Sequence, residues 1–521
     1  MITRYNGTMR NTQKTSIGMF TFGLLLHGCS PSPMAEWDPY AFAPPTPVTS
    51  WSPEWWPQEQ RPGNLQPTPQ QNTFAHKAAD NPTLEGLPEL IDLTVAADLA
   101  LRNSPQTRQA WAAARAAAAE YGISRADWYP TLTAWLQAIY DREIIGLGGA
   151  QNVLQLNQLN TGPGVTATWT VLDFGRREAA DNQMKYALIA SNYDFNREIQ
   201  TVLFDVQSHF FLLEAADGLL EAELSDLALA ETVLEGTEEQ LLVGLATMPQ
   251  VLVARQRFAL ASYEVEQARA NVHTSRVDLL TVMGLRPDVP LAFDLNSQTP
   301  LPDDLAVDLD QLVQLAFAMR PDLASAVAEV RAAEAGIQFA EAMLRPQIDF
   351  EGMVGLDYTN YHIDDIVTPP GSGDYLSPIW SVGLIGSWVF FEGGELDNNV
   401  RLARSQHQEA LAKLDAIRLD AAGEVWDAFF DYQAATRRYQ WSEALLESSQ
   451  ESADAIEASF GVGLSTLPEV LAAQYSLADA QSTRITSRAE LLTASAALIY
   501  ATGDLGSSDG REKRRRSTSG G

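Results

Sequence analysis

The chain has 521 residues and a formal net charge of −32, from 67 acidic and 35 basic side chains. This excess of acid argues against a nucleic-acid-binding protein, because phosphate binding needs a basic surface. The single cysteine excludes an intrachain disulfide framework. Beyond the N-terminus, no stretch approaches the roughly 18 uninterrupted apolar residues of a membrane-spanning helix.

Residues 1–28 are typical of a signal peptide. Basic residues precede an apolar run at 17–26, which has the length of a signal core and is too short to cross a bilayer as a helix. The run ends in Leu-His-Gly-Cys, which resembles the bacterial lipobox and predicts lipidation of Cys29. Ser30 is typical of sorting to the outer membrane within that class of signals. The alternative is an ordinary cleaved signal with an incidental cysteine.

Two segments are predicted to lack regular structure. Residues 29–86 are rich in Pro, Gln and Trp, which favours an extended tether. Its tryptophans could contact a membrane interface or the protein's own surface, and the sequence favours neither. Residues 507–521 form a basic, Gly/Ser-rich tail that we expect to be disordered.

The rest of the chain is duplicated. Residues 243–252 (VGLATMPQVL) match residues 462–471 (VGLSTLPEVL) at seven of ten positions. An internal repeat of roughly 200 residues indicates a duplicated half-protein rather than a solenoid, with repeat 1 at 87–290 and repeat 2 at 291–506. Trp169 matches Trp388 at the same spacing, whereas Pro130 matches Pro346 at a spacing three residues shorter. Three residues are therefore inserted between Pro346 and Trp388.

Long helices are predicted in both repeats. Residues 88–128 have helical character, and residues 176–242 and 395–461 contain almost no Pro or Gly over 67 positions each. A helix of that length extends about 100 Å. Because it is too long for the core of a compact domain, it must pack side by side with others, as in a coiled coil.

Four stretches with period two predict two β-hairpins, 129–173 and 346–391. Each strand has one apolar face and one small or polar face, as transmembrane strands of about 9–11 residues do. Four strands are too few to close a barrel, so a spanning barrel requires several chains. The connections at 142–163 and 359–378 are expected to be exposed loops. The alternative is a soluble sandwich.

The order of these elements resembles the TolC family of outer-membrane efflux proteins over residues 88–506. YPTLTAW and LRPQIDF enter the strands, and WTVLDFGRR and WVFFEGGE leave them. The resemblance implies an α+β membrane protein: a homotrimer whose 12-stranded transmembrane β-barrel takes four strands from each chain. A periplasmic α-helical coiled-coil barrel would continue it. Such proteins work with a periplasmic adaptor protein and an inner-membrane transporter, in the outer membrane of Gram-negative bacteria.

The repeated motif predicts helical tips near 243–250 and 462–469. A glycine at positive φ would end each first helix, and a Thr-x-Pro-Gln/Glu capping box would begin the next. The resemblance implies that the adaptor docks at these tips, and exposed apolar turn residues favour such a role over plain capped turns. The candidate docking residues are Val243, Gly244, Leu245, Thr247, Val462, Gly463, Leu464 and Thr466.

Carboxylates supply two further candidate sites. Glu469 lies one turn beyond the second tip, where relatives carry an acidic constriction ring, so it is a candidate gate. The doubly acidic pattern of relatives is missing here, since Ala472 follows on the same face, and Glu469 could be a capping residue only. Asp349, Glu351 and Asp357 are predicted to line the barrel lumen and to favour cations.

No enzymatic site is predicted. The six histidines have no metal-ligand spacing, and the chain lacks phosphate-binding, HExxH and nucleophile-elbow motifs. We therefore expect no metal and no cofactor. The sequence predicts a passive outer-membrane exit duct of a tripartite efflux system. The alternatives are a type I protein-secretion channel and a non-conducting periplasmic coiled-coil scaffold.

Overall fold

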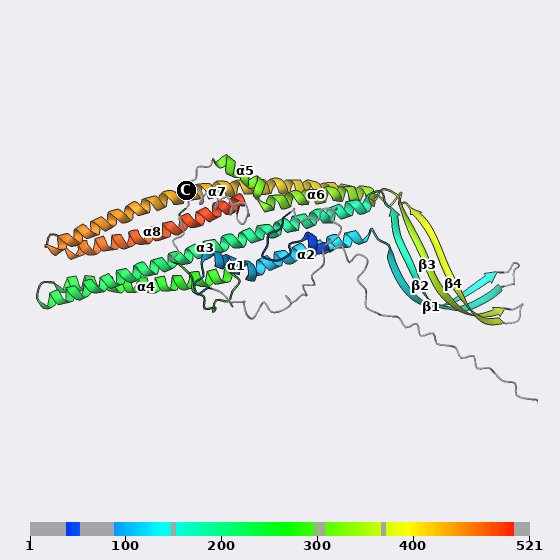
Figure 1. Cartoon of the computed structure of the whole chain (residues 1–521), viewed down its shortest axis with the longest axis horizontal. Helices are drawn as coiled ribbons and strands as arrows, with labels where there is room; N and C mark the ends of the chain where they lie inside the picture. Colours follow the sequence, from blue (N-terminus) through cyan, green and yellow to red (C-terminus); the bar gives the residue numbers. More distant parts are fainter. Residues whose placement is uncertain are drawn as a thin grey trace, which may run out of the picture.

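The computed structural model describes residues 38–52, 88–146, 153–295, 301, 308–365 and 371–504. Within them the chain forms a long helical rod with a four-stranded sheet at one end (Figure 1). The helices are α1 Leu93–Asn103, α2 Pro105–Ala126, α3 Arg176–Leu242, α4 Met248–Val282, α5 Leu309–Met319, α6 Pro321–Ala342, α7 Glu395–Gly461 and α8 Leu467–Thr502. None of the described helices is both long and apolar enough to cross a membrane.

The two repeats form two long helical hairpins. Helices α3 and α7 lead away from the sheet, and α4 and α8 run back along them. Both tips therefore lie at the end opposite the sheet (Figure 1). The shorter α2 and α6 pack against α3 and α7 near the sheet, and α3 also contacts α6 and α8 across the repeats. Helices α3 and α7 occupy the 67-residue intervals that the scarcity of Pro and Gly predicted.

The hydrophobic core is a chain of narrow clusters, because helices packed side by side enclose little volume. Its largest cluster joins α1, α3, α4 and the end of α8 at mid-length of the rod. Buried members include Phe210, Leu279, Leu280, Met283 and Ala496. Alanine fills many of the other buried helix positions and lets the helices approach closely.

The sheet is antiparallel in the order β1-β2-β3-β4, with β1 Thr131–Gly146, β2 Val153–Leu172, β3 Gln347–Asp365 and β4 Gly371–Ser387. The strands are longer than expected, and the prediction of exposed loops at 142–163 and 359–378 is wrong. Most of those residues pair within the hairpins. The alternation of apolar and polar residues weakens there, but the backbone ladder does not depend on side-chain polarity.

Strand β4 ends earlier than expected. It was predicted to reach residue 391, but its last pair joins Ser387 to Gln347, the first residue of β3. Residues 388–391 therefore extend past the end of their neighbour. In repeat 1 the corresponding residues 169–172 belong to β2, because β3 lies beside them.

The two hairpins share one register. Thr131 pairs with Thr168, and the repeat-equivalent Gln347 pairs with Ser387. At the far end, the pair of Gly146 with Val153 corresponds to the pair of His362 with Ser372. Each of the two repeat spacings thus holds along a whole strand, which places the three inserted residues between His362 and Ser372.

Part of the N-terminal tether is folded onto the helical body. Trp51 is only 4% exposed, and the amide groups of Asn192 and Asn196 donate to the carbonyl oxygens of Phe42 (2.8 Å) and Trp51 (2.7 Å). Trp51 therefore contacts the protein's own surface, which was one of the two alternatives. The signal peptide, Cys29, the other tether tryptophans and the basic tail lie outside the described residues.

Candidate functional site: the helical tips and the polar face of the sheet

Both tips are built by the same turn chemistry. Gly244 and Gly463 follow the ends of α3 and α7 with φ of 77° and 79°, a region that other residues enter at a cost. The N–H of Leu245 donates to the carbonyl of Gln240 (2.8 Å), and the N–H of Leu464 donates to that of Ser459 (2.9 Å). These bonds satisfy carbonyl groups at each helix end.

A capping box starts each following helix. The N–H of Thr247 donates to Oε1 of Gln250, and the N–H of Thr466 donates to Oε2 of Glu469, both at 2.7 Å. Hydrogen bonds from the backbone N–H and then the hydroxyl of Thr466 hold the pKa of Glu469 below its usual value. Within one chain, Glu469 therefore acts as a helix cap.

The tips carry exposed apolar side chains. Leu245 is 79% exposed and Leu464 is 83% exposed, and Val243 and Val462 are also exposed. Both turns lie at the same end of the rod (Figure 1). Apolar side chains held in a rigid, well-capped turn indicate a surface that contacts another molecule.

The two faces of the sheet differ in chemistry. Asp349, Glu351 and Asp357 lie on one face of β3, where polar neighbours bind two of them. The hydroxyl of Thr170 donates to Asp349 (2.7 Å), and the hydroxyl of Thr359 donates to Asp357 (3.2 Å). The opposite face is apolar and exposed, with exposed members on every strand: Leu132, Leu136, Tyr140, Val165, Trp169, Val354, Leu356, Trp380, Val382 and Leu384.

The corner between β2 and α3 positions the sheet on the rod. Phe174 and Gly175 both have positive φ, 51° and 96°. The carboxylate of Asp173 accepts hydrogen bonds from the backbone N–H (2.9 Å) and Nε (2.7 Å) of Arg177. Gly393 and Gly394 have positive φ at the corresponding corner of repeat 2. The Asp-Phe-Gly sequence at 173–175 thus forms a strand-to-helix corner.

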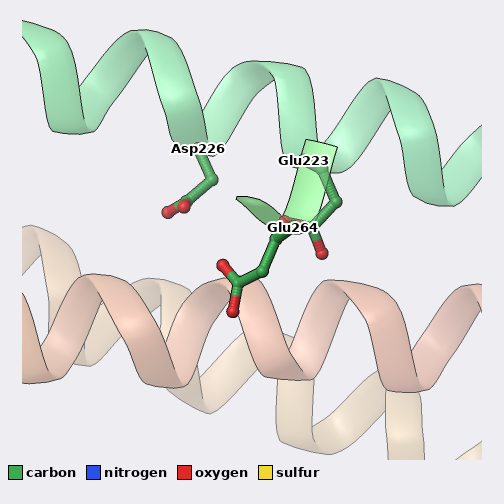
Figure 2. A group of neighbouring side chains, drawn as sticks. All are labelled: Glu223, Asp226 and Glu264. Carbon is green, nitrogen blue, oxygen red and sulfur yellow. The ribbon is translucent and has the colours of Figure 1, made fainter. Parts of the chain in front are cut away.

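One polar cluster was missed by sequence reasoning. Carboxylate oxygens of Glu223 and Asp226 on α3 and of Glu264 on α4 lie within 4.8 Å of one another (Figure 2). Arg257 lies among them, 2.6 Å from Asp226 and 3.4 Å from Glu264. Its guanidinium lies 5.3 Å from the ring centroid of Tyr475 on α8. The arginine therefore links both helices of the first hairpin to the second hairpin.

This cluster is charge-rich and partly buried. Burial raises the pKa of Glu223, and the charges of Glu264 and Asp226 raise it further. Asp226 and Arg257 are largely buried, with side chains 8% and 11% exposed. No histidine or spacing motif marked this group, because its members come from two helices and meet only in the folded hairpin.

Comparisons with known proteins match this architecture. The family model described as "Outer membrane efflux protein" matches residues 96–285 and 312–504. Protein CyaE of Bordetella pertussis is 27% identical over 425 residues, covering 80% of this chain and 85% of that protein. The pyoverdine export outer membrane protein OpmQ of Pseudomonas aeruginosa is 26% identical over 435 residues, with 80% and 85% covered.

The solved structures agree on the fold. The outer-membrane channel OprN superposes with a TM-score of 0.66 at 24% identity, covering 79% of this chain and 89% of OprN. The chain belongs to the outer membrane efflux protein family. Its family and its function class, an exit duct for efflux across the outer membrane, are those predicted from the duplicated motifs.

Proposed function

We propose that three copies of this chain form a 12-stranded barrel in the outer membrane, continued by a periplasmic helical tunnel. The two faces of the sheet support this arrangement. An apolar exposed face suits lipid, and a hydrogen-bonded polar face with Asp349, Glu351 and Asp357 suits a water-filled lumen. Four strands cannot close on themselves, so additional copies are needed to pair the outer edges.

The proposed duct is passive. A periplasmic adaptor protein docks at the two tips, and an inner-membrane transporter supplies the energy. Cys29 carries a lipid anchor in the outer membrane, and Glu469 narrows the tunnel entrance as one of three symmetry-related carboxylates. Two features support docking at the tips: their exposed leucines and the rigidity of their capped turns.

The contrast between the two sheet faces is the observation that carries the proposal. We expect purified protein to conduct ions in planar bilayers and to appear as three-fold particles. Reversal potentials in a salt gradient should indicate a preference for cations. That preference should fall when Asp349→Asn and Glu351→Gln are combined. A protein that never conducts and leaves the membrane without its lipid would instead be a scaffold.

A further inference from the structure

An open groove lies beside the folded part of the tether. It has a volume of about 730 Å³ and is lined by residues of α3 from repeat 1 and of α5, α6 and α7 from repeat 2. Its apolar lining includes Trp51, Tyr193, Phe317 and Val327. A groove of this volume can hold a drug-sized molecule, and exposed apolar surface of this kind indicates that another group covers it.

The charge of the groove is opposite to that of the chain as a whole. Four of its lining residues are basic and none of the described residues that line it is acidic, although acidic side chains outnumber basic ones by 67 to 35 overall. Arg320 is bound by carboxylates inside the protein. The other three are Lys185, Arg331 and Arg418. The chemistry of the groove therefore favours an occupant that is both aromatic and acidic.

The tether supplies such a segment at the groove itself. Its described part ends at Ser52, and the preceding residue, Trp51, already lines the groove. The next residues, 53–59, read Pro-Glu-Trp-Trp-Pro-Gln-Glu, with two tryptophans, two glutamates and no basic residue. Three residues of chain extend at most about 10 Å, so Trp55 and Trp56 follow closely enough to enter the groove.

The folded part of the tether shows how the helices bind it. On α2, the guanidinium of Arg115 lies 4.1 Å from the ring centroid of Tyr40 in the tether. One turn away, Nε1 of Trp111 donates to the carbonyl oxygen of Pro44 at 2.9 Å. An arginine and an apolar side chain, spaced i and i+4 on one helix, thus hold an aromatic and proline-rich stretch of the tether.

Repeat 2 has the corresponding helix positions at the groove. The counterparts of Trp111 and Arg115, at the shorter of the two repeat spacings, are Val327 and Arg331 on α6. Both line the groove. The arginine is kept, and the tryptophan is replaced by the much smaller valine. The site in repeat 2 therefore has room for an aromatic side chain in the place that repeat 1 fills with its own tryptophan.

We propose that the groove binds residues 53–59 of the same chain, with Trp55 and Trp56 against its apolar lining. Glu54 and Glu59 then lie near its basic side chains. The described tether contacts α2 and α3 of repeat 1, and this second contact joins it to α6 and α7 of repeat 2. The tether thereby holds the two repeats together. The inference does not depend on the proposed barrel, because the groove and the segment belong to one chain.

Thiol labelling tests whether the tether covers the groove. In the full chain, Val327→Cys should react slowly with a polar maleimide, because the tether tryptophans shield it. Adding Trp55→Ala and Trp56→Ala should raise its labelling rate about tenfold or more, because burial of two large aromatic side chains stabilises the covered groove. Peptide mass spectrometry separates labelling at position 327 from labelling at Cys29.

Matched variants control this measurement. Val277→Cys lies on α4 outside the groove, and Val277 is about as exposed in the chain (39%) as Val327 (36%). Its labelling rate should be the same with either tether, since a rise would report unfolding. Phe74→Ala changes an aromatic tether residue outside 53–59 and should leave position 327 shielded.

A charge reversal tests the same contact with both tryptophans in place. Glu54→Lys combined with Glu59→Lys places basic residues beside the basic side chains of the groove. The labelling rate of Val327→Cys should rise by about threefold, a smaller effect because exposed charge pairs contribute little.

Disulfide trapping identifies whose tether is bound. Trp55→Cys combined with Val327→Cys, with Trp56 retained, should form a cross-link within one chain on oxidation with copper phenanthroline. The single variants control for disulfides to Cys29. Covalent dimers that need both substitutions would show that the tether of another copy occupies the groove, and would overturn the assignment to the same chain.

A labelling rate of Val327→Cys that stays the same when both tryptophans are replaced would also overturn the proposal. If that rate were fast, the groove would be open. If it were slow, another molecule would cover it. Neither result would count against the duct, which conductance and three-fold particles test separately.

Discussion

The two long hairpins have the same backbone plan but different interior chemistry. Both have tips with a positive-φ glycine and a capping box. The charged group of the α3/α4 hairpin, however, has no counterpart in α7/α8. Glu223, Asp226, Arg257 and Glu264 correspond to Ser442, Leu445, Ser476 and Thr483. Duplication has therefore kept the turns and helix lengths, which the architecture requires, while the charges between the helices have diverged.

In the first hairpin an arginine connects neighbouring helices by noncovalent contacts, and the second hairpin has no arginine at the equivalent position. Arg257 contacts α3 through Asp226 and α8 through Tyr475. At the equivalent position, the hydroxyl of Ser476 donates to the carbonyl of Ala472 within its own helix. We infer that the α3/α4 hairpin depends on this largely buried charged group for its stability. The α7/α8 hairpin depends mainly on packing, because its interhelix ion pairs, Arg438 with Glu490 and Arg484 with Glu443, are exposed to solvent.

The largest expected effect is at the exposed tip leucines, which both hairpins have. Leu245→Asp or Leu464→Asp places a charge on an exposed turn, so stability should change by no more than about 0.5 kcal/mol. Export should nevertheless fall at least tenfold, because both tips are proposed to contact the adaptor. Ethidium accumulation in the host, with expression and oligomer checked, measures this. Tyr263→Asp, at a 66% exposed position on α4, is the control.

An outcome confined to one tip would sharpen the comparison between the repeats. If Leu464→Asp abolished export and Leu245→Asp did not, only the second repeat would carry the docking surface. Normal export by both variants would refute docking at the tips.

The next largest effect is expected at the charged group around Arg257, which only the α3/α4 hairpin has. Arg257→Ser introduces the repeat-2 residue and leaves buried Asp226 without its cation. Removing one partner of a buried pair costs about 3–5 kcal/mol. Hydrogen exchange of α3 and α4 amides near the cluster should rise by roughly a hundredfold or more, with little change in α7. Ser476→Ala, at the equivalent site, should stay within about 0.5 kcal/mol of the unmodified protein.

A complete exchange tests the reason for that loss. Combining Arg257→Ser with Glu223→Ser, Asp226→Leu and Glu264→Thr removes the stranded charges along with the arginine, and should recover most of the protection. A quadruple variant as unprotected as Arg257→Ser would show that the packing of the arginine, and not the unpaired acids, maintains the hairpin.

Local signals in the sequence predicted the tips and the long helices, but not the contacts between elements. Gly463, Thr466 and Glu469 lie within seven residues, so their turn chemistry can be read directly. The lengths of the strands and the contact of Arg257 with Asp226 depend on what lies opposite in the fold. Charged residues at 141–143 ended the predicted alternation, yet they continue β1 because β2 lies alongside.

The smallest expected effect is a difference in pH dependence between the capping boxes of the two tips, which contain Gln250 in the first and Glu469 in the second. Glu469 has a lowered pKa in the folded tip, so its capping contribution is fully present above the ordinary value of 4.5 and is lost as pH falls through the folded pKa. Gln250, at the same position of the first tip, does not titrate. Amide exchange corrected for its intrinsic pH dependence should therefore loosen at the second tip alone in acid.

The variant Glu469→Gln also tests the proposal that Glu469 narrows the tunnel entrance. It introduces the repeat-1 residue and preserves an acceptor for Thr466, so it should remove the pH dependence while keeping the cap. If Glu469 also forms a constriction ring, single-channel conductance and cation preference in bilayers should change together. If the variant conducts as the unmodified protein does, capping is the whole role of Glu469, and the two tips are equivalent in function as well as in geometry.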